Sequence, residues 1–539
     1  MEFKQGFDKL SVLLECSTTS TPTVASLKKY IDLLAAFGYT HFYLGLTDGF
    51  KIEGEPYFNF CRGGYTTEQL QEIDAYAQER GVELRANVQV LAHMPFMNRY
   101  TCYANLFDTD DTFYVGKPEV YEFVDKILAT MSKGIKSRTI HIGMDEAYRI
   151  GLGKYLEENG YTERRALLLQ HLQRVVELAK KYNYNCEIWS DVFFTLVRGS
   201  GFNDNGVIPS DIRDSIPEGV SLVHWTYDKR TDEVLNRHIA MHKAICDNFV
   251  FAGSAWKCMG LAPHNEYSMD IIQQQMEVCR QNQVGHYMLT LWSDMGGHCS
   301  MYAVLPTLFA AAEIAKGKTL ETIDKSRFKD IVGVDFDDFM LVDNLNNPLY
   351  HEITIRANRS YWGLLSDIFM GMYDWLLEDH NNDAYAALAE RYARVPAAEF
   401  KLMFDDYKYY ARVLSIKMNI GTRIRKAYHE GRKDLLEKYA REELPQMIAY
   451  MKEYINNFEK RWLSENMAFG LEVHHLYYGG LMRRWEYVIA RLEEHISDGQ
   501  PIEEMEREEL LPSGMGPDTN EDHVRAWGPT NNLITYCRY

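Results

Sequence analysis

Short β-favouring runs alternate with amphipathic helical stretches from about residue 11 to about residue 316, and this repetition restricts the fold more than any other feature. Eight strand–helix pairs follow one another, which predicts an α/β chain folded as a (β/α)8 TIM barrel. The competing doubly wound fold is disfavoured because no glycine-rich G-x-G-x-x-G turn follows the first strand. The predicted strands cover residues 11–16, 41–46, 83–90, 139–144, 186–190, 220–227, 249–256 and 285–292.

The chain changes character after about residue 317, where long, charge-rich helical stretches replace the alternation. This change predicts a barrel domain over residues 1–317, an all-α domain over 318–495 and a tail rich in Pro, Gly, Asn and Asp over 496–539. Helices are expected in the barrel at 23–37, 66–80, 118–132, 163–181, 233–246, 269–281 and 303–315, and in the helical domain at 349–378, 383–390, 399–427, 432–457 and 471–494.

The net charge argues against some classes of partner. The formal net charge is −19, whereas nucleic acids and anionic membranes both attract clustered Lys and Arg, so we expect neither as a partner. The N-terminus is polar, and no apolar segment is long enough to span a bilayer. Nine cysteines are scattered without a C-x-x-C pair, which favours reduced thiols. We therefore expect a cytoplasmic protein that acts on small or imported substrates.

The run from Thr139 to Ala147 passes from apolar, β-favouring residues through Gly143 into the adjacent carboxylates Asp145 and Glu146. Neighbouring side chains on a regular strand face opposite ways, but both acids can reach one pocket where the backbone leaves the pleat. In a shared dry cleft each carboxylate disfavours ionisation of the other, so one acid and one carboxylate result. An Asp-Glu pair at a strand end is also common as a helix cap or a solvated loop, so the pair alone does not establish catalysis.

The predicted strand ends share an aromatic and acidic composition. In a barrel these ends meet at one mouth, where the chemistry of barrel enzymes lies. Four of the nine tryptophans would surround this mouth, and converging aromatic rings beside carboxylates suit the apolar faces of a sugar. The residues at these ends include Asp48, His93, Asp145, Glu146, Trp189, Asp191, Trp225, Tyr227, Trp256, Trp292 and Asp294.

With these residues assembled, the chain resembles glycoside hydrolase family 20, the β-N-acetylhexosaminidases, whose signature is a strand ending H-x-G-x-D-E. It stands here as His141-Ile142-Gly143-Met144-Asp145-Glu146. The similarity is widest with bacterial members that lack the usual N-terminal α/β domain and carry a helical C-terminal domain, and it covers about residues 9–485. Further matching landmarks are Gly54-Glu55-Pro56-Tyr57-Phe58, Arg62-Gly63, Gln89-Val90-Leu91-Ala92-His93, Trp189-Ser190-Asp191 and Phe469-Gly470-Leu471.

The resemblance implies an exo-acting, retaining enzyme in which the substrate's own 2-acetamido oxygen attacks the anomeric carbon. Glu146 would be the general acid and then the general base, and Asp145 would hold the acetamido N–H. Tyr227 would hydrogen-bond the acetamido carbonyl. The residues expected to bind substrate are Trp225, Trp256, Trp292, Asp294, His298, Asp191, Asp48 and Thr18, and those expected to orient the acids from behind are His93 and His141.

Three departures from the family pattern concern the far edge of the sugar. The family's D-x-S-R after the first strand, whose Arg grips O3 and O4, is replaced by Glu15-Cys16-Ser17-Thr18. Glu-Asp after the second strand becomes Thr47-Asp48, and W-G-D-N-G-x-E after the eighth becomes Trp292-Ser293-Asp294-Met295-Gly296-Gly297-His298. Each lost hydrogen-bond partner would weaken transition-state binding by about 1–3 kcal/mol. We therefore expect a preferred sugar other than plain terminal GlcNAc, such as GalNAc or a substituted 2-acetamido sugar.

Other properties stay open at this stage. One alternative is a catalytically weakened family member that acts as a carbohydrate-binding protein, although the acids, Tyr227 and the tryptophans would be superfluous there. We expect no cofactor and no metal, since adjacent His474 and His475 diverge on a helix. The expected partner is a small oligosaccharide or glycoside read through the loops at 98–116 and 197–217. A symmetric homodimer is an arrangement that the sequence leaves open.

Overall fold

The computed structural model describes residues 7–17, 19–198, 213–246, 249–258, 260–294, 296–346, 359–371, 374 and 382–507. Thr18, most of the predicted loop at 197–217, much of the predicted helix at 349–378 and the tail after residue 507 lie outside this range. The chain divides into two compact units. The barrel unit holds residues 1–255, 268–292 and 307–323, and the helical unit holds residues 256–267, 293–306 and 324–539.

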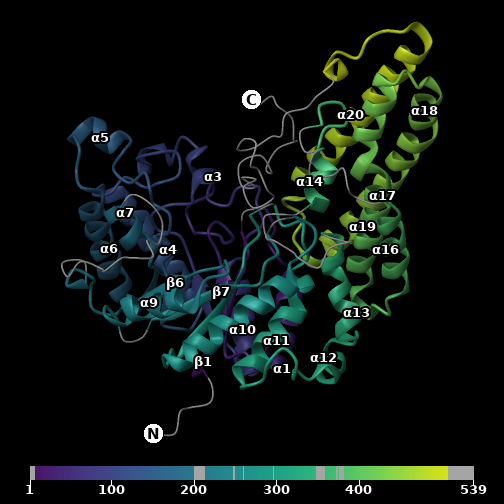
Figure 1. Ribbon diagram of the computed structural model, residues 1–539. Coiled ribbons are helices and arrows are strands. Elements are labelled where there is room, and N and C mark those ends of the chain that lie inside the picture. The colour runs from purple at the N-terminus through teal and green to yellow at the C-terminus, as the bar shows by residue number, and fades with distance from the viewer. Residues whose placement is uncertain are drawn as a thin grey trace. The chain divides into compact units, whose positions relative to one another are not determined.

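Eight parallel strands close into a barrel in chain order, with β8 paired to β1 (Figure 1). Leu13, for example, pairs with Tyr43 on one side and Thr290 on the other. This closure confirms the (β/α)8 barrel predicted from the alternation. The strands are β1 Lys9–Glu15, β2 His41–Gly45, β3 Glu83–Asn87, β4 Thr139–His141, β5 Asn185–Trp189, β6 Val220–Trp225, β7 Val250–Ser254 and β8 His286–Leu291.

Helices follow the strands, and local signals in the sequence set where they begin. Thr23 caps the first helix by accepting the Ser26 N–H, and Thr66 and Gln69 form a reciprocal capping box at the second. These side chains satisfy backbone N–H groups that a helix start leaves without partners. The main helices after the strands are α1 Val24–Phe37, α2 Thr67–Glu79, α4 Pro118–Gly134, α6 Arg164–Lys180, α7 Asp191–Arg198, α9 Asp232–Lys243, α10 Asn265–Gln281 and α11 Leu305–Ala315, with short helices α3 Pro95–Asn98 and α5 Lys154–Asn159.

Side chains from six of the strands, β1, β2 and β5 to β8, form a buried cluster in the barrel unit. Leu13, Tyr43, Trp189, Val223 and Met288 belong to one buried cluster, and each such side chain contributes about 1.5–3 kcal/mol by leaving water. Trp225 and Trp292 pack against this cluster while staying only partly buried. The interior packing therefore sets the position of the aromatic residues at the carboxyl ends of β6 and β8.

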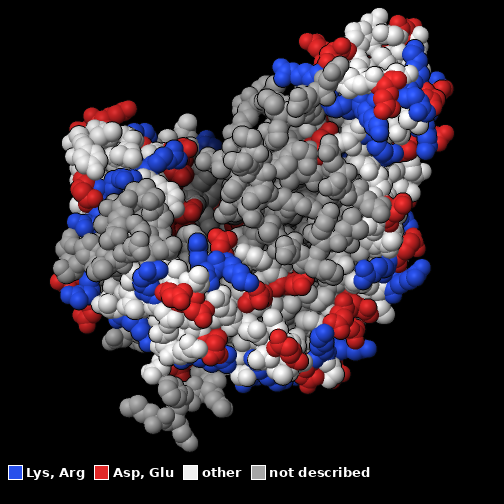
Figure 2. Space-filling model, in the orientation of Figure 1, with Lys and Arg blue, Asp and Glu red and all other residues white. Residues whose placement is uncertain are grey.

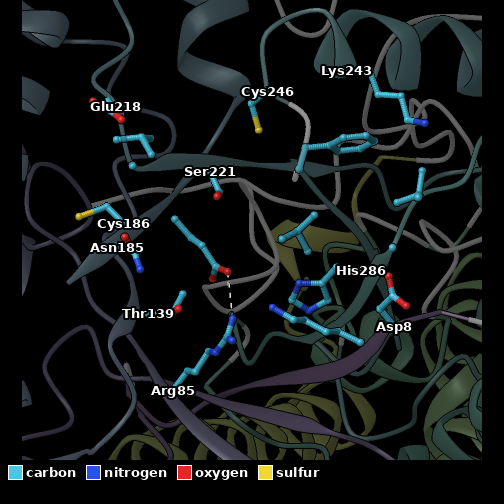
Figure 3. Close-up of a pocket in the computed structure, with 18 of the residues that line it drawn as sticks. Asp8, Arg85, Thr139, Asn185, Cys186, Glu218, Ser221, Lys243, Cys246 and His286 are labelled. Carbon is cyan, nitrogen blue, oxygen red and sulfur yellow. Dashed lines mark hydrogen bonds and ion pairs between the residues drawn. The ribbon is translucent and has the colours of Figure 1, made fainter. Parts of the chain in front are cut away.

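A polar cavity of about 1000 Å³ lies at the opposite, N-terminal end of the strands. Figure 3 shows Arg85 and His286 among its lining residues, with the ion pair from Arg85 to Glu187 marked. Arg85 also donates to the Tyr43 hydroxyl at 2.7 Å. A buried pair of this kind needs such added hydrogen bonds to offset the loss of hydration. The lining includes the first residues of six strands, Lys9, Thr139, Asn185, Val220, Val250 and His286.

The helical unit is built from long helices, of which α17 packs against both α16 and α19. At its centre the buried Arg461 pairs with Asp406 and Glu465. His474 is buried and lies 2.9 Å from the Gly296 carbonyl through Nε2, whereas His475 is exposed beside Glu459. The helices are α12 Lys325–Val332, α13 Phe336–Met340, α14 Arg359–Leu365, α16 Asn382–Arg394, α17 Lys401–His429, α18 Lys433–Lys438, α19 Leu444–Glu465 and α20 Leu471–Asp498.

One predicted helix is divided in the structure. The stretch expected at 432–457 forms α18 and α19, joined by a π-helical turn at Tyr439–Glu443. Pro445 is the second residue of α19, just after this turn, and proline has no N–H to donate to the carbonyl four residues earlier. The regular ladder is broken there, and a wider turn accommodates the missing bond.

Charged side chains of both signs are interspersed on the face shown in Figure 2. Ion pairs among the described residues include Arg432 with Asp434 at 2.6 Å and Arg491 with Glu494 at 2.5 Å, both at the surface. Pairs of this type are screened by water and contribute little to stability. Among the described residues, no helix is both long enough and apolar enough to cross a lipid bilayer.

Candidate active site

The chain turns sharply just after β4. Gly143, Met144 and Glu146 have φ values of 67°, 70° and 51°. A Cβ atom on Gly143 would lie 2.1 Å from Gln89 Oε1, so only glycine fits there. Left-handed backbone at two non-glycine residues is strained and persists only where the surroundings hold it. The backbone thus leaves the pleat just before the acid pair, which lets both acids face one region.

Two side chains that follow β3 hold Asp145. Gln89 Nε2 donates to Asp145 Oδ1 at 2.8 Å, and His93 Nε2 lies 3.2 Å from Asp145 Oδ2. Burial disfavours the charged form of Asp145, but the charge of His93 and these contacts outweigh burial and lower its pKa. Asp145 is therefore a carboxylate at neutral pH.

Glu146 faces the same ring nitrogen of His93 as Asp145 does. Its Oε2 atom is 3.7 Å from His93 Nε2, and the Tyr148 hydroxyl donates to its Oε1 atom at 3.3 Å. Burial raises the pKa of Glu146, and the negative charge of Asp145 raises it further. The two acids are therefore shifted in opposite directions, Asp145 toward the carboxylate and Glu146 toward the carboxylic acid.

His93 carries the positive charge of this site. The charge of Asp145 chiefly, opposed by burial and aided by Glu146, raises the pKa of His93 to about 10. The ring is therefore an imidazolium at neutral pH. Its backbone φ is 61°, so the residue is also held in the left-handed region. His93 thus lies between the two acids as a fixed cation.

Asp191, the first residue of α7, accepts hydrogen bonds from both the acid turn and β6. Its Oδ2 atom accepts the Glu146 N–H at 3.0 Å, and its Oδ1 atom accepts the Trp225 Nε1–H at 3.3 Å. Burial, followed by the charge of Asp145, raises the pKa of Asp191 to about 7. Although three carboxyl groups and a histidine gather here, the described residues include no His, Cys, Asp or Glu group arranged to hold a metal ion.

The aromatic residues of β6 and β8 contact one another beside the acids. Trp225 and Tyr227 are stacked, with ring centroids 5.1 Å apart. Trp292 Nε1 donates to the Tyr227 hydroxyl at 3.0 Å. Trp189 lies 5.9 Å from Trp292 between ring centroids but is 1% exposed, so it belongs to the barrel core. Trp225, Tyr227 and Trp292 form a connected aromatic group, whereas the strand-end composition predicts four tryptophans there, Trp189 and Trp256 included.

His141 lies fully buried beneath the turn. Its Nδ1 atom accepts the Gly143 N–H at 3.0 Å, and its ring lies 4.4 Å from Trp189 between centroids. Burial lowers the pKa of His141 to about 3, so the ring is neutral. With Nδ1 as an acceptor, the proton of the neutral ring is assigned to Nε2. His141 contacts the backbone of the turn and orients it.

Asp48 follows β2 and is 1% exposed. It forms an ion pair with Arg62, a cation that the sequence reasoning used only as a landmark of the family. The Arg62 guanidinium in turn lies over the Phe96 ring, 5.3 Å from its centroid. The structure thus places an arginine beside Asp48 although the first strand supplies none. No spacing in the sequence points to this pair, because a loop brings the two residues together.

Three further predicted substrate-binding residues, Trp256, Asp294 and His298, belong to the helical unit. Trp256 is 6% exposed and Asp294 is exposed. His298 is buried, with its Nδ1 atom 3.0 Å from the Tyr478 hydroxyl. Burial, with the charge of Arg461, lowers the pKa of His298 to about 3, so the ring is neutral. Thr18 lies outside the described residues.

Gln89 and Tyr148 also contact the acid pair, although the sequence does not mark either one as a site residue. Gln89 precedes His93 by four positions and contacts Asp145, and Tyr148 follows Glu146 by two positions and contacts it. Both contacts depend on the left-handed turn, which brings backbone and side chains together in a way that no periodic pattern specifies. The family landmark that contains Gln89 was the only signal in the sequence that could have pointed to it.

Comparison with known families identifies both parts of the chain. The family model "Glycosyl hydrolase family 20, catalytic domain" matches residues 21–241, which include the acid pair. The family model "Glycoside Hydrolase 20C C-terminal domain" matches residues 337–524. Two models of one family thus cover most of the chain in the expected order.

Curated relatives and solved structures are more distant. "Beta-hexosaminidase 3" of Arabidopsis thaliana is 23% identical over 40% of this chain and 42% of its own, and "Hexosaminidase D" of Homo sapiens is 24% identical over 44% and 49%. The matches thus span under half of these relatives' length. A family 20 exo β-N-acetylglucosaminidase from Vibrio harveyi superposes with a TM-score of 0.47 at 17% identity, over 62% of this chain and 58% of that one. On the two family models, this chain belongs to glycoside hydrolase family 20.

Proposed function

We propose that this protein is an exo-acting, retaining β-N-acetylhexosaminidase that releases a terminal 2-acetamido sugar by substrate-assisted catalysis. The observation that carries the proposal is the opposite pKa shift of two neighbouring carboxyl groups, Asp145 downward and Glu146 upward. A glycosidase needs one protonated acid and one carboxylate at the same pH. The beta-hexosaminidase names of the curated relatives agree with this chemistry.

Glu146 is the residue proposed to move the proton. Its carboxylic acid protonates the glycosidic oxygen as the bond from that oxygen to C1 breaks. The acetamido carbonyl oxygen forms a bond to C1 from the opposite face, giving an oxazolinium ion. The Glu146 carboxylate then takes a proton from water as the water oxygen attacks C1 and opens the ring. Two inversions at C1 give retention of configuration.

Asp145 is proposed to accept a hydrogen bond from the acetamido N–H and to stabilise the positive charge that develops on the oxazolinium ring. A preorganised carboxylate suits this role because it is charged before the substrate arrives. The contacts from Gln89 and His93 support that state, since each favours the ionised form.

The aromatic group is proposed to fold the acetamido group toward C1. An indole N–H can only donate, so the Tyr227 hydroxyl accepts the bond from Trp292. The same hydroxyl is proposed to donate to the acetamido carbonyl. Trp225, stacked on Tyr227, supplies a flat apolar surface beside the same position. In the same proposal Asp48, on the barrel unit, contacts the rest of the sugar.

For the sugar itself, we propose GalNAc, GlcNAc or a substituted 2-acetamido sugar, with plain terminal GlcNAc disfavoured. The first strand is followed by Glu15-Cys16-Ser17-Thr18 and so supplies no arginine for O3 and O4. The Arg62 ion pair with Asp48 supports a rebuilt far edge, because it brings a cation to the end of β2 from a different loop. A guanidinium there can donate to sugar hydroxyls in a geometry different from that of a strand-end arginine.

The testing experiment compares turnover of aryl 2-acetamido-2-deoxy-β-glucoside and β-galactoside by the wild type and by Glu146→Gln and Asp145→Asn. Removing a general acid or a transition-state charge partner is expected to lower kcat by about 10²–10⁴-fold. Glu157→Gln, an exposed carboxylate on α5, is the matched control and should leave kcat unchanged.

The ratio of the two activities also tests which sugar the protein prefers. A strong preference for unsubstituted GlcNAc would contradict the proposed specificity while leaving the mechanism intact. Unchanged kcat in Glu146→Gln would remove the proposed acid. Binding of the sugars by a folded wild type without any turnover would instead favour a carbohydrate-binding protein.

A further inference from the structure

Gln89 occupies a position from which a single side chain reaches both the backbone and the carboxylate of the acid turn. It lies two residues beyond β3 and is 6% exposed. Its Oε1 atom accepts the Met144 N–H at 3.1 Å, and its Nε2 atom donates to Asp145 Oδ1 at 2.8 Å. The Met144 N–H can only donate and the ionised Asp145 carboxylate can only accept. These two contacts therefore fix which end of the Gln89 amide is the oxygen and which is the nitrogen.

This pair of contacts demands an uncharged side chain that both donates and accepts. A carboxylate could accept the Met144 N–H but would face Asp145 Oδ1 with a second negative charge. An apolar side chain of similar length would leave the buried Met144 N–H without its bond. Among side chains of this length, the amide serves both partners at any pH.

The packing shows that the turn is shaped around Gln89. A Cβ on Gly143 would lie 2.1 Å from Gln89 Oε1 and 2.8 Å from the Val88 carbonyl oxygen. Met144 keeps its strained φ of 70° while its N–H is bound by this same Oε1 atom of Gln89. The strain in the turn is therefore offset in part by the Gln89 amide.

We propose that Gln89 is a positioning residue for the hexosaminidase reaction: its neutral amide holds the turn at residues 143–146 and keeps Asp145 charged by donating a hydrogen bond to it. The proposal rests on the proposed function, because it assigns a role in that reaction. It extends that function by giving an uncharged residue a share, beside His93, in keeping Asp145 charged.

Other charged groups also face Asp145 and must be considered in any pH dependence. His93 from the segment after β3 favours the carboxylate, whereas Glu146 and Asp191 carry like charge when ionised. His141 of β4 is neutral. Asp111 acts on His93 from the segment that precedes α4. All of them remain when Gln89 is replaced, so a change at Gln89 isolates its own contribution.

The test replaces Gln89 by Glu, which has the same shape, and measures kcat/KM against pH. At low pH the introduced carboxyl is protonated and can both donate and accept, so activity should stay within about threefold of wild type. Above its raised pKa it repels Asp145, and kcat/KM relative to wild type should fall about tenfold per pH unit. Gln71→Glu, an exposed glutamine of α2, is the matched control and should follow the wild-type profile.

A second variant, Gln89→Met, keeps the length and removes both bonds. Loss of the hydrogen bond raises the pKa of Asp145, so the acid limb of kcat/KM should move to higher pH. A residue with only a structural role would lower activity equally at every pH. Profiles of Gln89→Glu and Gln89→Met that run parallel to wild type would therefore overturn the proposal.

Thermal unfolding tests the contact without any need for activity. The carboxyl group introduced by Gln89→Glu should have a higher pKa in the folded state than in the unfolded state. The stability of the variant relative to wild type is therefore retained at low pH and lost as pH rises through the folded-state pKa. The Tm deficit against wild type should widen as pH rises from about 5 to about 8. A widening deficit supports the contact even if the wild type hydrolyses no 2-acetamido glycoside, and a deficit that does not vary with pH contradicts it.

Discussion

At the scale of single residues, the site depends on one cation between two acids. His93 lies 3.2 Å from Asp145 and 3.7 Å from Glu146, and its charge lowers the pKa of both. Adjacent carboxyl groups alone would oppose each other's ionisation. Because His93 lies nearer to Asp145, it stabilises the carboxylate of Asp145 more than that of Glu146. This difference separates the roles of the two acids.

Replacing His93 by Ala should move the pH profile of kcat/KM to higher pH. The imidazolium lowers the pKa of Asp145 and of Glu146, so its removal raises both values. The acid limb, where Asp145 must ionise, and the alkaline limb, where Glu146 must stay protonated, then both move upward. The maximum should fall about 10- to 100-fold with the lost charge partner.

Profiles measured with an aryl 2-acetamido glycoside would check this prediction, with His475→Ala as the control because His475 is an exposed histidine of the helical unit. A profile of His93→Ala that moves to lower pH would contradict the assigned charge of His93.

The sequence predicts much of this residue-scale arrangement and misses some of it. The motif places Asp145 and Glu146 at a strand end and implies that one stays protonated, which agrees with the pKa directions in the structure. The contacts made by Gln89 and Arg62 are not predictable from spacing. They form between loops whose backbone has positive φ or lacks regular pairing, and no hydrophobic period describes such segments.

At the scale of elements, all eight strands begin within two residues of the predicted positions, but several end earlier than expected. β3 ends at Asn87 rather than at residue 90, and β4 ends at His141 rather than at residue 144. The residues beyond, such as Val88 and Val90, are still fully buried. A hydrophobic run in the sequence indicates burial and not strand pairing. The run therefore continues past the end of the strand, through the segments that lead to the site.

Replacing Gly143 by Ala should damage the turn after β4 far more than an ordinary glycine replacement. The new Cβ would meet Gln89 Oε1 at 2.1 Å and would also sit at a φ of 67°. Relieving the clash must shift the turn that carries both acids, so kcat should fall about 100-fold or more and stability by about 2–3 kcal/mol.

The matched control for this substitution is Gly81→Ala. Gly81 has a similar φ of 71°, but a Cβ added there would have nothing within 4 Å, so the variant should lose only about 1 kcal/mol and no activity. Steady-state kinetics and thermal unfolding of both variants would test the difference. Equal effects of the two substitutions would show that packing against Gln89 is unimportant.

At the scale of the whole molecule, a hydrophobic pattern describes residues in chain order, whereas a compact unit is defined by contacts between residues that can be far apart in sequence. Residues 256–267 and 293–306 lie in sequence between segments of the barrel unit, yet they belong to the helical unit. Asn265 Nδ2 donates to Asp343 Oδ1 at 2.9 Å, and Arg461 Nη2 donates to the His298 carbonyl at 2.8 Å. These bonds join residues far apart in sequence, so a boundary drawn from composition near residue 317 cannot reveal them.

A fragment of residues 1–323 should therefore fail to fold as a stable barrel. It contains the two segments 256–267 and 293–306 but lacks Asp343 and Arg461, so the polar groups that those residues satisfy would lose their partners. Without the helical unit, apolar side chains of these segments that are buried in the full chain, such as Leu261 and Met301, would be exposed to water at a cost of about 1.5–3 kcal/mol each. A domain's total stability is only about 5–15 kcal/mol. We expect aggregation in size-exclusion chromatography and no cooperative thermal transition. The full chain carrying Asp343→Ala, which breaks one of these contacts, should stay folded with a lower Tm, and a monomeric fragment melting like the full chain would contradict the prediction.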